Sequence, residues 1–564
     1  MIINWLLFYY CSIVFSVAVN PLPKPQNLTW QDVDNPIILN IDDLIITNLT
    51  NSSIIHQAIN RTFTSVKELK WYPYTNETKF NFSDNFSTSD AKLSININDY
   101  YADLQFGVDE SYNISVTRNA LKIDASTIWG ALHGLTTLQQ LIVYNDEKFY
   151  IEGSLTVIDY PNYPHRGLLI DSARNYLTVP SILEQIDLLS ISKMNSLHWH
   201  IVDTQSWPLE LESYPEMTDD AYSKDEVYTR NDIEYIIDYA KYRGVRIIPE
   251  IDMPGHARAG WRQIDPNLVE CGNEFWSNAG LEPPPGQLNI LNNETYIAIA
   301  NVFNEVSEIF EDKVFHVGLD ELGKTCYPQD WFNDNKTLSD LTQYYLNNAL
   351  PIFNNATNDK KLIMWDDVLL SDEAVDNLST NITIQIWHDP SGIKQLTSKG
   401  YDVIISSYTY LYLDCGYGGY ITSSDLYTNN PKNNKVNSCN GGSYCTYKTW
   451  QRIYDLDFTA NLTETEQKHV KGAEVTLFGE QVDSTVLTGK IWPRSAALAE
   501  STWSGNKFQD GSFRNYDLTQ RILNFREFLV KLGYSVSPIA PKYCVMNPHK
   551  CDQYEYYHEV SNSY

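Results

Sequence analysis

From residue 165 onward, the chain repeats one pattern: a short apolar run, then a stretch whose apolar residues recur at helical spacing. Strands buried on both faces of a parallel sheet read as such runs, and each needs a crossover helix to reach the next. Eight runs span about 350 residues: Gly167–Asp171, Ser196–Asp203, Val245–Asp252, Val314–Glu321, Lys361–Asp366, Thr383–Asp389, Asp402–Ser407 and Glu474–Glu480. This α/β pattern predicts a (β/α)8 barrel.

A second, smaller domain is expected before the barrel, over residues 19–163. Alternating runs such as 94–98, 112–116 and 121–123 are typical of half-buried strands, and 126–143 has helical spacing, which together predict an α+β unit. The barrel domain is expected over 164–541, with a closing helix at 517–532 and a disulfide-closed tail at 542–564. Two long insertions stand out, 253–292 and 413–450, and the second, rich in Gly, Asn and Tyr, is expected to form a loop over the active face.

The first 18 residues form an apolar stretch without acidic residues that ends in Ser16-Val17-Ala18, small residues of the kind a signal peptidase reads. We expect a cleaved secretory signal, with an uncleaved anchor as the alternative. Fourteen Asn-X-Ser/Thr sequons, from Asn27 to Asn461, also indicate a secreted glycoprotein, either extracellular or held in the cell wall or periplasmic space.

The charge balance limits the partners of the chain. A formal net charge of −30, from 41 basic and 71 acidic residues, argues against nucleic acid and anionic membranes as partners. No apolar run after the leader is long enough to span a bilayer.

The chain has eight cysteines, of which Cys11 would leave with the leader. An oxidising compartment favours pairing of the remaining seven. Spacing alone does not fix which cysteines are paired. A Cys439–Cys445 disulfide is therefore an alternative to the expected set, in which Cys439 is the odd cysteine. The expected disulfides are Cys271–Cys326, Cys415–Cys445 and Cys544–Cys551. No Cys-His cluster has the spacing of a zinc site.

Polar and aromatic residues gather where the eight runs end, and barrel enzymes place their active sites at this face. A lone His or Trp is more often a core residue, so only the joint placement favours a site. Aromatic faces stack on sugar rings, while Arg and carboxylates bind hydroxyl groups, so the set predicts a carbohydrate site. The set comprises Asp171, Arg174, His198, His200, Asp203, Glu250, Asp252, His256, Asp320, Glu321, Trp365, Trp387, Tyr412, Asp414, Phe478 and Glu480.

Four of these segments resemble the family 20 glycoside hydrolases, the β-N-acetylhexosaminidases. They are Arg166–Arg174, His198–Asp203, Glu250–His256 and His316–Glu321, and Trp492-Pro493-Arg494 fits as well. The resemblance covers nearly the whole chain after the leader. With its leader and sequons, the chain is similar to fungal members of the family. The resemblance implies release of terminal N-acetylglucosamine from chitooligosaccharides or glycans, with N-acetylgalactosamine as a second candidate sugar. It also implies that no metal or cofactor is needed, and it allows a homodimer.

Adjacent carboxylates do not easily straddle a sugar ring as acid and nucleophile. The resemblance implies instead that the 2-acetamido carbonyl of the substrate attacks the anomeric carbon, giving an oxazolinium ion and retention. Glu321 would be the general acid and then the base, and Asp320 would hold the acetamido N–H. The other implied roles are acetamido positioning by Tyr412, pocket walls from Trp365 and Trp387, hydroxyl binding by Arg174, Asp414 and Glu480, and a relay from Asp203 and His256 to Glu321.

Phe478 departs from the family pattern, which usually has a third pocket Trp at this position. Phe keeps a stacking face but lacks the indole N–H, so we expect activity with an altered substrate fit. The alternatives are a disaccharide-specific or transglycosylating relative, a non-catalytic sugar-binding barrel, and a two-carboxylate glycosidase that does not depend on the acetamido group.

Overall fold

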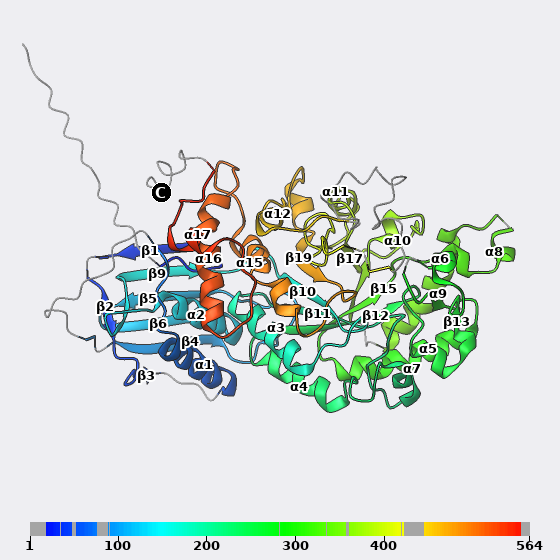
Figure 1. Cartoon of the computed structure of the whole chain (residues 1–564), viewed down its shortest axis with the longest axis horizontal. Coiled ribbons are helices and arrows are strands. Elements are labelled where there is room, and N and C mark those ends of the chain that lie inside the picture. Colours follow the sequence, from blue (N-terminus) through cyan, green and yellow to red (C-terminus); the bar gives the residue numbers. More distant parts are fainter. Residues whose placement is uncertain are drawn as a thin grey trace, which may run out of the picture.

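A computed structural model of the chain shows a small domain at one end and a larger barrel domain at the other (Figure 1). The structure describes residues 19–33, 35–47, 52–75, 88–89, 91–280, 282–333, 335–356, 360–418, 420–421 and 445–553. The expected leader, 1–18, and Cys439 lie outside these residues.

The predicted barrel is confirmed as a closed ring of eight parallel strands paired in chain order, with β10 against β19 closing it. The strands are β10 (His165–Asp171), β11 (Ser196–Val202), β12 (Arg246–Met253), β15 (Val314–Gly318), β16 (Lys361–Trp365), β17 (Thr383–Ile386), β18 (Val403–Ile405) and β19 (Val470–Leu477). Several end earlier than the apolar runs do, so that residues such as Asp320, Glu321 and Trp387 lie on loops beyond their strands.

Helices cover the outside of the barrel, and their apolar faces join one large core with the strands. The longer ones are α3 (Val179–Ile191), α4 (Arg230–Lys241), α7 (Asn293–Ile309), α9 (Leu338–Ala356), α11 (Ser391–Thr397) and α15 (Ser495–Ser504). Helix α16 (Asn515–Lys531) confirms the predicted closing helix and lies between the two domains (Figure 1). Short elements include α10 (Asp367–Leu370), α12 (Trp450–Tyr454), α13 (Glu464–Gln467), α14 (Leu487–Ile491) and α17 (Lys542–Met546). The first insertion adds α5 (Trp261–Ile264), α6 (Trp276–Ala279) and a hairpin of β13 (Val269–Glu270) and β14 (Gln287–Leu288).

The small domain is a six-stranded sheet whose apolar face packs against two helices, as expected for an α+β unit. The sheet order is β1-β9-β5-β6-β4-β3, formed by β1 (Asn27–Gln31), β3 (Ile46–Thr47), β4 (Lys92–Asp99), β5 (Tyr112–Thr117), β6 (Ala120–Thr127) and β9 (Ser154–Asp159). A second sheet contains β2 (Ile37–Leu39), β7 (Val143–Asn145) and β8 (Lys148–Ile151). Helix α2 (Ile128–Leu141) matches the predicted helix, whereas α1 (Ser53–Leu69) was not predicted.

Buried ion pairs join the two domains. Arg166 on β10 contacts Glu110 at 2.6 Å, and Lys193 contacts Asp159 at 2.9 Å, with all four side chains almost fully buried. Removal of one partner of such a pair leaves an uncompensated charge, at a cost of about 3–5 kcal/mol. The two domains therefore form one packed unit.

The segment 19–26 lies along the seam between the domains. Its backbone N–H groups donate to side chains of both: Leu22 to Gln140 Oε1 at 2.9 Å, and Lys24 to Glu500 Oε2 at 3.0 Å. The carbonyl of Pro21 accepts from Arg521 on α16. We call this segment, residues 19–26, the seam segment.

All three expected disulfides are present: Cys271–Cys326, Cys415–Cys445 and Cys544–Cys551. The alternative pair Cys439–Cys445 is therefore wrong, because Cys445 is bonded to Cys415. Among the described residues, no helix combines the length and apolar character needed to cross a bilayer.

Candidate active site

The two adjacent carboxylates lie on a sharp turn just after β15 rather than on the strand itself. Leu319 and Glu321 have φ of 78° and 54°, a left-handed conformation that non-glycine residues rarely adopt. Gly318 precedes them at φ 70°, and a Cβ there would lie 1.6 Å from Asp252 Oδ1. Only glycine fits this position, so the turn places the acid pair against the end of β12.

A chain of charged contacts runs from Glu321 into the barrel. His256 Nε2 lies 3.1 Å from Glu321 Oε2, and His256 Nδ1 lies 3.2 Å from Asp203 Oδ1. The second oxygen of Asp203 contacts Arg174 Nη1 at 2.6 Å and His200 Nε2 at 2.9 Å. The structure thus brings together Asp203, His256 and Glu321 in the order that the sequence resemblance implies.

The charges of His256 and Asp203 follow from the groups that surround them. Burial alone would lower the pKa of His256, but Asp203 and the neighbouring carboxylates outweigh burial and raise it well above its ordinary value. Burial opposes ionisation of Asp203 too, yet Arg174 and His256 hold its pKa well below the usual range. His256 is therefore an imidazolium between carboxylates near neutral pH.

Asp320 is next to Asp252, and both carboxyls are largely buried. Burial, followed by the nearby carboxylate of Asp252, raises the pKa of Asp320 well above its ordinary value, and burial raises that of Asp252 to about 7. Within the described part of the chain, the buried Oδ1 of Asp320 has no hydrogen-bond donor. A buried acceptor without a donor is costly, so this oxygen is suited to receive a ligand N–H.

Three of the predicted aromatic residues form one cluster beside the acids. Trp387 and Tyr412 are stacked, with ring centroids 6.3 Å apart, and Tyr412 lies 5.5 Å from Phe478. Trp365 is 1% exposed, and its Nε1 donates to Glu250 Oε1 at 2.8 Å. The indole N–H of Trp387 donates to Asp367, so both Trp rings have fixed orientations.

Arg174 is surrounded by carboxylates, including one that the sequence did not reveal. Its Nε and Nη2 donate to Glu282 Oε1 at 3.0 and 2.7 Å, and the hydroxyl of Tyr420 donates to the other oxygen of Glu282 at 2.9 Å. Glu282 lies in the first insertion, and only its position before three consecutive prolines marked it. A sugar hydroxyl that binds Arg174 Nη2 must share it with Glu282.

Glu480 is near Arg174 as well, and Asp414 is near Glu480. Burial raises the pKa of Glu480 to about 8, helped by the negative charges of Glu282 and Asp414 and opposed by Arg174. A protonated carboxyl group both donates and accepts hydrogen bonds, which matches the hydrogen-bonding capacity of sugar hydroxyls.

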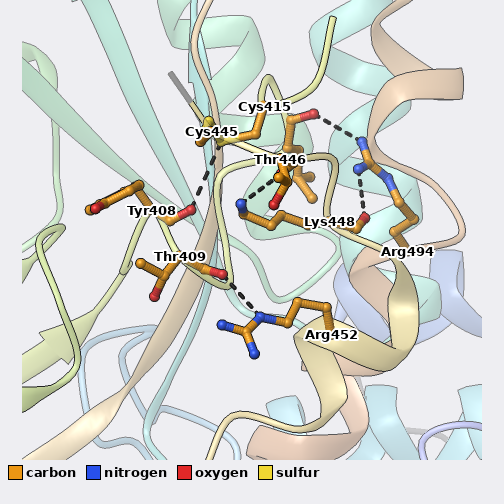
Figure 2. Close-up of a disulfide and its surroundings, with 9 residues drawn as sticks. Tyr408, Thr409, Cys415, Cys445, Thr446, Lys448, Arg452 and Arg494 are labelled. Carbon is orange, nitrogen blue, oxygen red and sulfur yellow. Dashed lines mark hydrogen bonds between the residues drawn. A yellow bond between two sulfur atoms is a disulfide. The ribbon is translucent and has the colours of Figure 1, made fainter. Parts of the chain in front are cut away.

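The loop that carries Tyr412 and Asp414 is held from several sides, as Figure 2 shows. Leu413 N donates to the Thr476 carbonyl of β19 at 2.7 Å, just before Phe478. Arg494 donates to the carbonyls of Leu413 and Lys448, at 3.0 and 2.8 Å, and the buried Cys415–Cys445 disulfide closes the other side. This explains why Arg494 belongs with the site motifs although it lies outside the acid cluster.

His198, His316 and Glu250, which the sequence placed near the site, lie fully buried inside the barrel. Together they are one of four groups of His, Asp or Glu among the described residues whose ligand atoms approach closely enough to hold an ion. The oxygens of Glu250 already receive N–H groups from Trp365 and His200, which fits a hydrogen-bonded network better than an ion site.

Comparison with known proteins places the chain in a family. The glycosyl hydrolase family 20 catalytic domain matches residues 163–506, and a β-acetyl hexosaminidase-like domain matches residues 21–141. The chain belongs to glycosyl hydrolase family 20. A β-hexosaminidase of Emericella nidulans is 43% identical over 97% of each chain, and β-hexosaminidase 1 of Coccidioides posadasii is 43% identical over 96% of each.

Solved structures show the same fold. A Flavobacterium johnsoniae chitobiase has a TM-score of 0.70 at 24% identity, covering 91% of this chain and 73% of that one. A family 20 β-N-acetylhexosaminidase from Streptomyces coelicolor has a TM-score of 0.68 at 21% identity, covering 92% and 98%. The predicted family and fold class are confirmed, and the chain is a glycoside hydrolase.

Proposed function

We propose that this family 20 hydrolase is a secreted exo-β-N-acetylhexosaminidase that removes terminal non-reducing N-acetylglucosamine, with retention and through an oxazolinium ion. The fungal β-hexosaminidases that match almost the full chain at 43% identity support the activity. The observation that carries the mechanism is that the buried Oδ1 of Asp320, next to Glu321, has no donor among the residues that the structure describes. An acetamido N–H supplies the missing donor.

In the proposed first step, the acetamido carbonyl oxygen bonds to the anomeric carbon as the glycosidic C–O bond breaks. Glu321 protonates the leaving oxygen, and Asp320 stabilises the positive charge that develops on the acetamido group. The hydroxyl of Tyr412 donates to the carbonyl oxygen and keeps it aimed at the anomeric carbon. In the second step, Glu321 takes a proton from water, which attacks the anomeric carbon and restores the acetamide.

The aromatic cluster of Trp387, Tyr412 and Phe478 supplies apolar faces for the sugar, with Trp365 as the inner wall of the acetamido pocket. Arg174, Asp414 and Glu480 bind the ring hydroxyls. His256, charged and 3.1 Å from Glu321, orients the acid/base carboxyl and links it to Asp203.

The first test compares matched aryl β-glycosides of N-acetylglucosamine and glucose at acidic pH. We expect rapid release only from the N-acetyl sugar, because glucose has no group for Asp320 and Tyr412 to hold. Equal release from both would point to a protein nucleophile and the two-carboxylate alternative. Release from neither would favour a sugar-binding barrel or a disaccharide-specific enzyme.

A second test addresses Glu321. The Glu321→Gln variant should lose about 100-fold or more in kcat on alkyl glycosides, which need a proton on the leaving oxygen, and much less on dinitrophenyl glycosides, which do not. Steady-state kinetics with both leaving groups measure this difference. Equal losses on the two substrates would remove Glu321 from the role of general acid.

Secretion and assembly are part of the proposal. The leader ending at Ala18 and the sequons support export, and the family resemblance supports a homodimer. Sequencing the amino terminus of the exported protein should give Val19, and sedimentation of the deglycosylated enzyme should give twice the chain mass. A retained leader or a monomer would refute the corresponding part.

A further inference from the structure

Beneath the candidate site, the fully buried carboxylate of Glu250 on β12 contacts side chains from three other strands. Its Oε1 accepts from Trp365 Nε1 at 2.8 Å and lies 2.9 Å from His316 Nδ1. Its Oε2 lies 2.7 Å from His200 Nδ1 and 3.1 Å from His198 Nε2. Glu250 therefore touches β11, β15 and β16 at once.

The two oxygens of Glu250 lead to two different parts of the proposed site. Oε1 fixes the indole of Trp365, the proposed inner wall of the acetamido pocket. Oε2 fixes His200, which contacts Asp203 and, through Asp203 and His256, reaches Glu321. One side chain that is too deep to meet a substrate thus connects the pocket wall with the acid/base group.

The charges around His200 show what Glu250 does to it. The charged groups that face His200 are Glu250 from β12, Asp171 at the end of β10, and Asp203 and Arg174 from the loops beyond the strands. Burial lowers the pKa of His200. The carboxylate of Glu250, and to a smaller extent that of Asp203, outweighs this effect and raises the pKa to about 10. A charged imidazole donates from both nitrogens, so His200 can bind Glu250 and Asp203 simultaneously.

We propose that Glu250 is a positioning residue that sets both the acetamido-pocket wall, through Trp365, and the acid/base relay, through His200, without touching the substrate. The inference rests on the proposed function, since it concerns the same site. It predicts that neutralising Glu250 alters N-acyl selectivity and pH dependence together.

Glu474 on β19 provides a matched control. It is equally buried and accepts from His165 at 2.9 Å, from His198 at 2.8 Å and from Gln385. Among the described contacts, none joins Glu474 to Trp365 or His200. Glu474→Gln therefore removes the same charge from the same interior and keeps the direct contacts of both branches, while its neighbour His198 still contacts Glu250.

The experiment compares wild type, Glu250→Gln and Glu474→Gln with aryl glycosides of N-acetyl- and N-propanoylglucosamine across pH 3–9. In Glu250→Gln, His200 loses the carboxylate that raises its pKa most, while Asp203 and Asp171 remain, so its pKa falls and its charge is lost at lower pH. We expect the basic limb of kcat/KM to move down by about one unit or more. We also expect kcat to fall about tenfold or more, as for other residues that orient a catalytic group. The ratio of kcat/KM for the N-propanoyl substrate over the N-acetyl substrate should change by about threefold or more. Glu474→Gln should stay within about threefold of wild type in kcat and in this ratio, and its basic limb should stay in place.

Glu250→Gln with an unmoved basic limb and an unchanged N-acyl ratio would overturn the proposal, as would Glu474→Gln showing the same changes. If Glu250→Gln does not fold, the branches are tested separately. Trp365→Phe removes the indole N–H that Glu250 holds, together with part of the ring, and should change the N-acyl ratio alone, while His200→Gln should move the pH limb alone. The proposal would also be refuted if either variant changed both the N-acyl ratio and the basic limb, or changed neither of them. The wild-type preference for the N-acetyl sugar over glucose is measured first, so failure of the proposed function is seen independently.

Discussion

At the scale of single residues, the contact between the carboxyls of Asp252 and Asp320 limits how these two groups can ionise. Two buried carboxyls side by side cannot both be ionised without repulsion, and both have a raised pKa. The pair therefore retains a proton more readily than an isolated carboxyl does, and a substrate N–H bound at Asp320 would favour the ionised form of Asp320. The glycine at 318 makes this contact possible, because any side chain there would displace Asp252.

The Asp320→Asn substitution keeps the shape of the side chain and removes its charge. We expect kcat to fall by about 100-fold or more, since the developing positive charge loses its counter-charge. The melting temperature should stay within a few degrees or rise, because repulsion with Asp252 is relieved. Kinetics and thermal unfolding measure the two effects, with the exposed Asp225→Asn as control. An unfolded Asp320→Asn protein would favour a structural role.

Phe478 touches both the aromatic cluster and the hydroxyl-binding residues: its ring lies 5.5 Å from Tyr412 and 5.4 Å from the guanidinium of Arg174. Phe478→Trp adds an N–H and volume at this junction. We expect the ratio of kcat/KM for N-acetylglucosaminides over N-acetylgalactosaminides to change by about threefold or more. The half-exposed Phe508→Trp serves as control. An unchanged ratio would mean that position 478 does not shape the sugar fit.

At the scale of elements, the site depends on loops that are tied down at several points. Tyr412 and Asp414 follow β18 on a loop that pairs with β19, is held by Arg494 and is closed by the Cys415–Cys445 disulfide. Catalytic groups on loops need such support, because small displacements of reacting groups cost large factors in rate.

The paired change of Cys415 and Cys445 to Ser tests this support. We expect kcat/KM to fall about tenfold and far-UV circular dichroism to stay unchanged, because the loop loosens while the barrel keeps its hydrogen bonds. The same change at Cys544 and Cys551 in the tail should leave kcat/KM within about twofold. Equal effects of the two double variants would show that the first disulfide has no special tie to the site.

The eight barrel strands were predictable, because burial on both faces makes each of them a continuous apolar run. Helix α1 was not predicted, although its buried residues Ile55, Ile59 and Phe63 recur at helical spacing, because it lies in a polar, sequon-rich region that is typical of loops. The turn after Gly318 was also missed, because the positive φ of Leu319 and Glu321 has no signature in residue type. Glu282 was missed because only the path of the insertion brings it to Arg174.

At the scale of the whole molecule, many buried carboxyls favour an acidic medium. Burial is the main cause that raises the pKa of Asp367 to about 6, of Asp252 to about 7, of Glu480 to about 8 and of Glu373 to about 9. In the unfolded chain these groups ionise near 4, so between about pH 4 and pH 9 the folded state binds more protons. The free energy of unfolding therefore falls as pH rises through this window.

We expect the melting temperature to be higher at pH 5 than at pH 8. It should fall again below about pH 4, where Glu110 and Asp517, both with a pKa of about 2, begin to lose the advantage of their ion pairs. Thermal unfolding at pH 3, 5 and 8 measures this profile. Glu373→Gln should reduce the drop between pH 5 and pH 8. A protein more stable at pH 8 than at pH 5 would contradict the prediction.

The seam segment has a consequence for the order in which the protein is made. Its backbone is synthesised before the rest of the small domain, yet Lys24 binds Glu500, a partner that lies 476 residues further along the chain. Domains generally fold in the order in which they leave the ribosome. The small domain can therefore form its sheet early, but the seam segment waits without its final partner until residue 500 has emerged. The two domains are locked together only after that point of translation.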